Sequence, residues 1–337
     1  MELDLHGLLK DEPELWDLFT LKKCYSGDNG IPEDPFCPSV SRFLSQNGVK
    51  FEYPENKQFA VCLTHDIDDI YPPLSNMLLS MAHNVKNVDL SGLSRDVSWK
   101  FKGIKSSPFL NFKEIMALED RFDARSSFYF MATDRDIKRF RYDIEDVESE
   151  MGQIADTGRE IGLHGGYYAY NDLDAMIKEK SAVEKTLGKA ICGYRNHYLR
   201  FSYPETWELL ELAGFRYDTT IGYSNGVGFK NGMCHPFKPY NITADKKMGI
   251  LEIPMAVMDC ALFEHTRSFR EAWDVTKRLI DETEHYNGVI TMLWHNDAFS
   301  SAYKRDWMKM YVKLMDYAHG KNAWITSGEN VYKWWDR

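Results

Sequence analysis

Short apolar runs rich in β-branched and aromatic residues alternate with longer segments of helical periodicity from residue 59 onward. Such alternation predicts βα units around a parallel sheet. About eight units favour closure into an α/β barrel over an open sheet. The predicted strands are FAVCLT (59–64), SSFYFMA (126–132), EIGLHG (160–165), AICGYR (190–195), RYDTT (216–220), ILEIPMAV (250–257), GVITMLWH (288–295) and AWITS (323–327).

Two segments lie outside this alternation. Residues 1–58 precede the first predicted strand and read as short helices and turns, so we expect an N-terminal flank packed on a barrel formed by residues 59–337. Residues 72–110 form a long insertion between the first strand and its helix. An insertion at the carboxyl end of a barrel strand falls on the catalytic face. There it could wall the active site or be peripheral decoration, and both interpretations stay open.

Composition and charge exclude several classes of partner. The 337-residue chain carries 41 basic and 51 acidic residues, a net charge of −10, and its basic residues are scattered. We therefore expect no nucleic-acid partner, and no basic block suggests anionic lipid. No apolar run is long enough for a transmembrane segment. The acidic N-terminus lacks a signal-peptide pattern and the six cysteines form no CxxC pair, which favours a reduced, cytoplasmic protein.

Chemically active side chains gather at the ends of four predicted strands. Because the carboxyl ends of barrel strands meet on one face, we expect residues that are far apart in the sequence to form one active site. A lone histidine at a strand end is usually structural, but four such ends together indicate a shared site. The residues are Asp66 and Asp68 after the first strand, His164 in the third, Arg195, Asn196 and His197 after the fourth, and His295, Asn296 and Asp297 at the end of the seventh.

The types of these side chains predict metal-assisted hydrolysis. Aspartate and imidazole with no thiolate partner suit a divalent metal, zinc above all, with cobalt or another first-row ion as alternatives. A metal polarises a carbonyl and lowers the pKa of a bound water, a free carboxylate can take a proton, and an imidazole can protonate a leaving group. This division of roles fits hydrolysis of an amide or an ester.

Five motifs in order resemble those of the polysaccharide deacetylases, the carbohydrate esterases that include chitin and peptidoglycan deacetylases. The resemblance spans roughly residues 59–330, and the THDID and RNHY variants resemble a bacterial subgroup associated with surface-glycan biosynthesis. It implies a distorted (β/α) barrel and metal-dependent removal of N- or O-acetyl groups from sugars. The matching segments are LTHDID (63–68) for the family's T-F-D-D-G, SSFYF (126–130) for ATFF, GREIGLH (158–164) for G-x-E-I-G-x-H, VEKTLGKAICGYRNHY (183–198) for the run ending R-x-P-Y, and LWH (293–295) for L-x-H.

The resemblance implies a role for each matching residue. Asp66 corresponds to the general base and Arg195 to the arginine that orients it. His164 corresponds to the first metal-binding histidine, and His295 to the late histidine that acts as general acid. A residue inserted between the two aspartates offsets Asp68 by one position from the family's metal-binding aspartate, and we carry the ligand role to it.

The sequence departs from the family at the second metal-binding histidine. Tyr168 stands at that position, and a neutral tyrosine is a poor zinc ligand. His197 stands where the family has proline, so we expect an Asp68–His164–His197 triad. Two alternatives remain open for the missing ligand, namely His65, which neighbours the base, and His235. Tyr198, which matches the tyrosine of the same motif, Tyr168 and His65 are also candidates for contact with substrate.

Three functions follow, in decreasing order of support from the motifs. The first is a metal-dependent deacetylase acting on an N-acetylated sugar of a glycan or glycan precursor, which could be soluble, nucleotide-linked or lipid-linked. The second is a hydrolase of non-sugar C–N bonds in ureides or formamides, since some relatives of the family work without a metal. The third is a non-catalytic glycan-binding protein. Retention of a base, its orienting arginine and an acid argues against the third.

Overall fold

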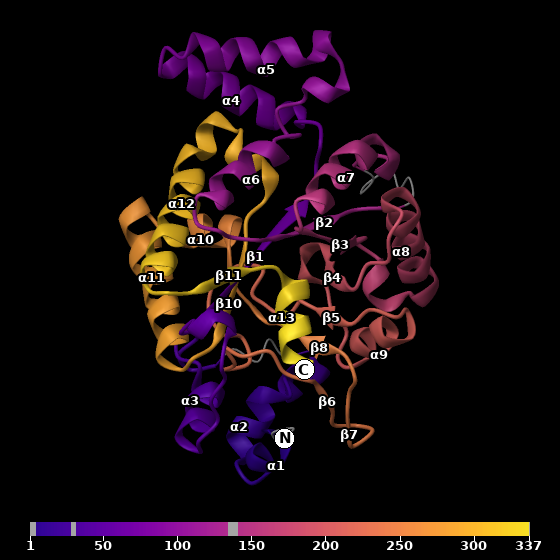
Figure 1. Cartoon of the computed structure of the whole chain (residues 1–337), viewed down its shortest axis with the longest axis vertical. Coiled ribbons are helices and arrows are strands. Elements are labelled where there is room, and N and C mark those ends of the chain that lie inside the picture. The colour runs from indigo at the N-terminus through magenta and orange to yellow at the C-terminus, as the bar shows by residue number, and fades with distance from the viewer. Residues whose placement is uncertain (1–4, 28–31, 134–140, 337) are drawn as a thin grey trace.

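The computed structural model describes residues 5–27, 32–133 and 141–336. Its main feature is a curled sheet of parallel strands in the order β8-β5-β4-β3-β2-β1-β10-β9, with β11 paired to the start of β1 (Figure 1). The expected (β/α) barrel is therefore confirmed. The strands are β1 Ala60–Ile67, β2 Ser127–Phe130, β3 Glu160–Gly165, β4 Gly193–Asn196, β5 Tyr217–Asp218, β8 Leu251–Glu252, β9 Met255–Met258, β10 Val289–Leu293 and β11 Trp324–Thr326, with a small ribbon of β6 Tyr240–Asn241 and β7 Lys246–Lys247.

Strand β1 runs further than its sequence suggested. Every residue of β1 is buried, and its first half pairs with β10 while its second half pairs with β2. The pairing with β2 continues to Ile67 opposite Phe130. Asp66 therefore lies inside the strand, near its carboxyl end, and not in the loop that follows. The backbone pairing of β1 with β2 fixes the position from which the Asp66 side chain extends.

The segment ILEIPMAV, expected as one strand, is two. Leu251 pairs with Tyr217 in β5, whereas Met255 pairs with Thr291 in β10 at the other end of the strand order. Pro254 lies between the two strands and has no N–H to donate to a ladder, so a continuous strand is interrupted there. The two ends of the curled sheet are thus joined by the chain itself.

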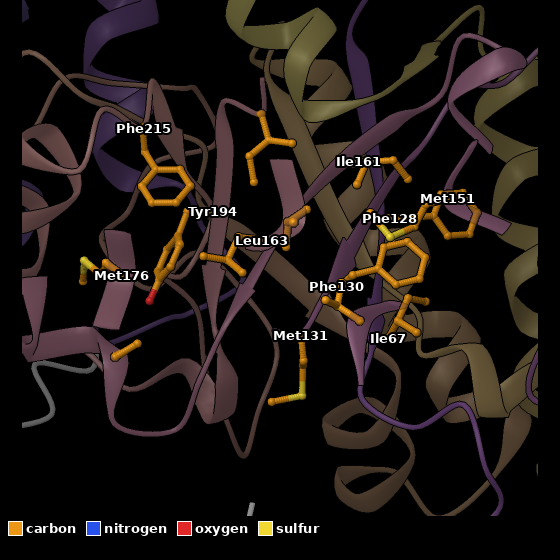
Figure 2. Packing of buried hydrophobic residues seen from close by; sticks show 14 of the residues in the cluster. Ile67, Phe128, Phe130, Met131, Met151, Ile161, Leu163, Met176, Tyr194 and Phe215 are labelled. Atoms are coloured by element: carbon orange, nitrogen blue, oxygen red, sulfur yellow. The ribbon is translucent and has the colours of Figure 1, made fainter. Parts of the chain in front are cut away.

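Helices cover the outside of the sheet, and their ends follow local sequence signals. In α8 the Asp172 side chain accepts a hydrogen bond from the Ala175 N–H, and Gly188, with φ of 72°, ends the helix. Figure 2 shows one face of the sheet, where Phe128 and Phe130 pack against Met151 of α7. The helices that follow β-strands or connect them are α6 Phe112–Asp120, α7 Glu148–Asp156, α8 Leu173–Leu187, α9 Glu205–Leu212, α10 Asp259–His265, α11 Phe269–His285, α12 Arg305–Gly320 and α13 Gly328–Trp335.

The N-terminal segment and the insertion lie at opposite ends of the long axis (Figure 1). Helices α1 (Leu5–Lys10), α2 (Pro13–Phe19) and α3 (Ser39–Gln46) bury an apolar cluster against Met233 and Phe237. The insertion forms an antiparallel pair, α4 (Leu74–Lys86) and α5 (Leu90–Lys102). No helix within the described ranges has the length and apolar character required to cross a membrane.

Candidate metal centre and acid–base groups

Three side chains from separate strands meet at the carboxyl edge of the sheet. Asp68 follows β1, His164 lies in β3, and His197 begins the short helical turn η6 (His197–Leu199) after β4. Asp68 Oδ1 is 3.1 Å from His164 Nε2 and 3.4 Å from His197 Nδ1. The two imidazole nitrogens are 3.0 Å apart. The structure thus brings together the three residues that the sequence analysis proposed as a triad.

The spacing and the chemistry of the triad fit a tetrahedral metal. Bonds of about 2.0–2.2 Å at tetrahedral angles place zinc-bound ligand atoms about 3.3 Å apart, which agrees with the three separations. Asp68 Oδ1 is buried and has no hydrogen-bond partner among the described residues. Such an atom is costly unless a cation or donor meets it. His164 Nδ1 lies 3.1 Å from the Arg195 carbonyl oxygen, so Nδ1–H donates and the Nε2 lone pair faces the triad.

Electrostatics at the triad favour a charged carboxylate and treat the two imidazoles differently. Burial would lower the pKa of His164, but the Asp66 and Asp68 carboxylates outweigh it and raise that pKa. Burial would raise the pKa of Asp68, but His197 and His164 outweigh it and hold that pKa well below its usual range. Burial lowers the pKa of His197, and this effect exceeds the attraction of Asp68. A neutral imidazole is the form that binds a metal. His197 can therefore bind a metal without first losing a proton.

Asp66 is held beside the triad by a buried arginine. Arg195 is fully buried, and its Nη1 donates to Asp66 Oδ1 at 3.0 Å and to the Thr64 hydroxyl at 2.7 Å. Its Nε donates to the Thr219 carbonyl at 3.1 Å, and Nη2 donates to the Thr219 hydroxyl. The other oxygen of Asp66, Oδ2, lies 3.7 Å from His164 Nδ1. The guanidinium thus fixes one carboxylate oxygen and leaves the second free to accept a proton.

His295 lies on the Asp68 side of the triad and is oriented by Asp259. The His295 Nδ1–H donates to Asp259 Oδ1 at 2.6 Å, and the His295 backbone N–H donates to Oδ2 at 2.8 Å. Its Nε2 lies 3.8 Å from Asp68 Oδ2. Burial would lower the pKa of His295, but the Asp259 carboxylate outweighs it and raises that pKa well above its usual range. This imidazole is therefore held in its protonated form, as a general acid requires.

Asp259 is a residue of this site that the sequence analysis missed. It follows β9 directly and begins α10, so it occupies a strand end like the other site residues, and that position was the signal that could have identified it. The merged prediction for β8 and β9 placed the strand end at residue 257 and hid this position. Asp259 and His295 are also close to Cys260. Burial raises the pKa of the Cys260 thiol to about 11, so it remains a thiol and a poor metal ligand.

Exposed tyrosines border the triad. Tyr168 and Tyr198 are each 55% exposed, and the Tyr198 ring lies 4.3 Å from the His197 ring. The Tyr167 ring contacts both, at 4.8 Å from Tyr168 and 5.8 Å from Tyr198. The Arg200 guanidinium lies over the Tyr167 ring at 4.1 Å. These contacts connect a row of aromatic side chains to His197 of the triad.

Two histidines that the sequence analysis considered lie in the protein interior and bind protein atoms with both ring nitrogens. His65 is fully buried; its Nδ1 is 2.8 Å from the Trp294 carbonyl oxygen and its Nε2 is 2.9 Å from Glu119 Oε1. The expectation of a substrate or metal contact by His65 is therefore wrong. Residues i and i+1 of a strand point to opposite faces, so His65 points away from the site that Asp66 faces.

His235 is also structural. Its Nδ1 accepts from the Ser41 hydroxyl at 2.8 Å, and its Nε2–H donates to the carbonyls of Tyr286 and Asn287, each at 3.1 Å. It ties α3 of the N-terminal segment to the barrel. The possibility that His235 supplies the missing ligand is thus excluded by its position, which leaves His197.

Comparison with known proteins bears on the fold. No family model matches the sequence. The peptidoglycan deacetylase of Helicobacter pylori is 26% identical over 125 residues, which cover 35% of this chain and 39% of that relative. The match thus spans less than half the length of the relative.

Solved structures give a longer match. A protein described as a candidate polysaccharide deacetylase from Mycobacterium smegmatis has a TM-score of 0.56 at 16% identity, over 85% of this chain and 92% of that one. The family 4 carbohydrate esterase from Streptomyces lividans has a TM-score of 0.40 at 10% identity, over 81% and 93% of the two chains. At these identities the first likeness establishes the fold, and this chain has the curled α/β barrel of the polysaccharide deacetylase structures.

Proposed function

We propose that this chain is a metal-dependent hydrolase that removes an acetyl group from an N-acetylated sugar of a glycan or glycan precursor. The observation that carries the proposal is that three side chains able to hold a metal lie at one sheet edge with a separate carboxylate, Asp66, and a separate imidazole, His295. A binding protein has no need for the last two groups. The names of the relatives, a peptidoglycan deacetylase and a polysaccharide deacetylase candidate, support the choice of an acetylated sugar as substrate.

Asp68, His164 and His197 would hold the metal, with zinc the ion that best suits two imidazoles and one carboxylate. When bound, the ion would polarise the acetyl carbonyl and lower the pKa of water, which is the chemistry that an unassisted amide hydrolysis lacks. The remaining groups of the site supply the proton transfers.

Asp66 is placed to take the proton of the attacking water. The Arg195 guanidinium holds Oδ1 and orients Oδ2 toward the His164 side of the triad. His295 is placed to deliver a proton to the leaving nitrogen, since Asp259 binds its Nδ1–H and leaves Nε2–H directed toward the triad. Water adds to the acetyl carbon, the C–N bond breaks, and acetate and a free amino sugar are the products.

Tyr168 and Tyr198 are the side chains proposed to contact the sugar. Both are exposed beside the metal centre, and an aromatic ring offers a flat apolar face to the C–H side of a pyranose. Their position, rather than any hydrogen bond in the structure, supports this role.

Acetate release tests the proposal. The zinc-reconstituted chain is incubated with N-acetylglucosamine oligomers, peptidoglycan fragments and nucleotide-linked N-acetyl sugars, and acetate is measured with a coupled enzymatic assay. The Asp66→Asn variant is the matched control, because it keeps the metal ligands. We expect acetate from at least one class of sugar with the wild type and none with the variant. Ammonia or formate from a ureide or formamide panel, with no acetate from any sugar, would contradict the proposal and support the second function.

A further inference from the structure

The α4–α5 hairpin exposes most of the large apolar side chains found on the surface. Of the thirteen exposed large apolar or aromatic side chains of the described residues, eight lie on this hairpin or its turn. They range from 40% exposed at Val97 to 87% at Phe101. Scattered surface leucines are ordinary, but such a concentration on one small element marks an interaction site. The eight are Leu74, Leu78, Leu79, Val85, Val88, Leu90, Val97 and Phe101.

On each helix of the hairpin, three of the exposed apolar residues share one face. Leu74, Leu78 and Val85 are spaced i, i+4 and i+11 on α4, and Leu90, Val97 and Phe101 are spaced i, i+7 and i+11 on α5. At 3.6 residues per turn each set forms a single stripe. Both stripes face solvent, so they do not stabilise the hairpin itself.

Polar side chains lie where the two helices approach each other. The Asn84 side chain donates to Asp96 Oδ2 at 2.8 Å, and both residues are buried. A Cβ added at Gly92 would lie 2.7 Å from Asn84 Oδ1, which shows how closely the helices approach there. A polar pair is thus buried between the helices while two apolar stripes face solvent. Its apolar side is available for an apolar partner.

The basic residues of the hairpin indicate that the apolar partner carries negative charge. The hairpin, residues 74–102, contains four basic and two acidic residues, in a chain whose net charge is −10. Both acids are engaged, Asp96 with Asn84 and Asp89 with Arg305. Lys86, Lys100 and Lys102 are exposed and form no ion pair with any part of the chain that the structure describes. Exposed leucine and phenylalanine beside unpaired lysines fit the surface of an anionic bilayer.

The hairpin is also coupled to the catalytic edge. Asn76 of α4 donates to the Tyr303 hydroxyl at 3.0 Å and to Asp297 Oδ2 at 3.4 Å. Asp297 lies two residues after His295, in η7 (Asn296–Phe299). Figure 1 shows the α4–α5 pair extending beyond the barrel at one end of the long axis. If the hairpin binds a membrane, these hydrogen bonds would fix the distance between the membrane surface and η7, the turn that follows His295.

We propose that the α4–α5 hairpin docks this chain peripherally on an anionic lipid surface. The sequence analysis expected no such partner because the basic residues are dispersed along the chain; the helical fold gathers them beside the apolar stripes. Combined with the proposed function, docking selects an N-acetylated sugar that is carried on a lipid. The docking itself is independent of whether that function is correct, since it is measured without substrate.

Vesicle co-sedimentation of the full chain tests the docking. The vesicles contain equal parts of phosphatidylglycerol and phosphatidylcholine, and vesicles of phosphatidylcholine alone are the lipid control. We expect binding to the anionic vesicles that weakens when added salt shortens the Debye length from about 10 Å to about 3 Å. The double variant Leu78→Ser/Phe101→Ser is expected to bind at least tenfold more weakly. Each exposed lysine contributes about fivefold in affinity, so Lys100→Gln/Lys102→Gln, which removes two, is expected to lose about 25-fold.

Leu212→Ser on α9 is the matched control, because Leu212 is equally exposed and lies outside the hairpin. It is expected to bind as the wild type does. Circular dichroism confirms that each variant is folded. Absence of wild-type binding to the anionic vesicles would overturn the proposal, as would binding that is unchanged in Leu78→Ser/Phe101→Ser. A concentration-dependent dimer that the same double variant dissociates, without vesicle binding, would assign the apolar stripes to a second copy of this chain and also overturn it.

Discussion

Replacement of Asp259 by asparagine separates the general-acid role of His295 from its metal environment. Three N–H groups converge on the Asp259 carboxylate, namely those of the His295 ring, the His295 backbone and the Cys260 backbone, at 2.6, 2.8 and 2.6 Å. An asparagine amide presents one oxygen and one NH₂, so in either orientation its NH₂ faces an N–H. The ring loses its charged partner, and the neutral tautomer becomes favoured.

The size of the effect follows from these contacts. A catalytic imidazole whose buried aspartate partner becomes asparagine loses about 10⁴-fold in kcat, or about 5 kcal/mol of transition-state stabilisation. Here the backbone contacts also hold His295 in place, so we expect a loss of about 10³- to 10⁴-fold in Asp259→Asn. Because Asp259 raises the pKa of His295, the alkaline limb of the pH–rate profile should move to lower pH in the variant.

The assay is acetate release over a range of pH on the sugar identified for the wild type. Metal content is measured in parallel and should stay close to the wild-type value, since Asp259 is not a proposed ligand. Thermal unfolding is measured to show that the variant is folded at the assay temperature, although the unpaired buried N–H lowers its stability. Activity within threefold of the wild type, with an unmoved alkaline limb, would refute the assignment of His295 and Asp259 as the acid and its orienting group.

Three further predictions concern residues around the site and the N-terminal segment. Asp68→Asn should lose the metal, whereas Asp66→Asn should retain it and lose turnover, as measured by metal analysis and acetate release. Arg195→Met should unfold at least 3 kcal/mol more easily in urea, since it leaves the buried Asp66 carboxylate without its partner. Burial lowers the pKa of His235 from 6.5 to about 4. The unfolded chain therefore binds a proton that the folded chain does not, and stability should fall by about 3 kcal/mol as the pH drops from 6.5 to 4; His235→Gln should remove this part of the pH dependence.

Local patterns in the sequence were sufficient for most of the fold. The apolar runs predicted β3 at Glu160–Gly165 and placed β1, β2, β10 and β11 within a few residues of their observed bounds. Both faces of a parallel strand inside a barrel are buried, so the strand is a continuous apolar run that can be recognised from a few neighbouring residues. The split at Pro254 was missed because a single proline within an apolar run does not show that its two halves pair with different neighbours.

The site was harder to predict where it depends on contacts between distant segments. The substitution of histidine for proline at position 197 was visible in the sequence, and its proximity to His164 follows from the pairing of β3 with β4. The role of Asp259 depends instead on the pairing of β9 with β10, which no local pattern shows. His65 and Asp66 are adjacent in sequence, and only the direction in which the strand faces distinguishes a core residue from a site residue.

The metal content of the purified chain is the most direct test of the proposed Asp68–His164–His197 site. Wild type, His197→Ala and Tyr168→Ala are prepared without chelator, reconstituted with zinc and dialysed. The zinc content per chain is then measured by inductively coupled plasma mass spectrometry. Tyr168→Ala is the matched control, because the resemblance to the polysaccharide deacetylases aligns Tyr168 with a metal ligand, although it is exposed and outside the triad. We predict about one zinc per chain in the wild type and in Tyr168→Ala, and at least tenfold less in His197→Ala. Full zinc occupancy in His197→Ala, or none in the wild type, would contradict the account.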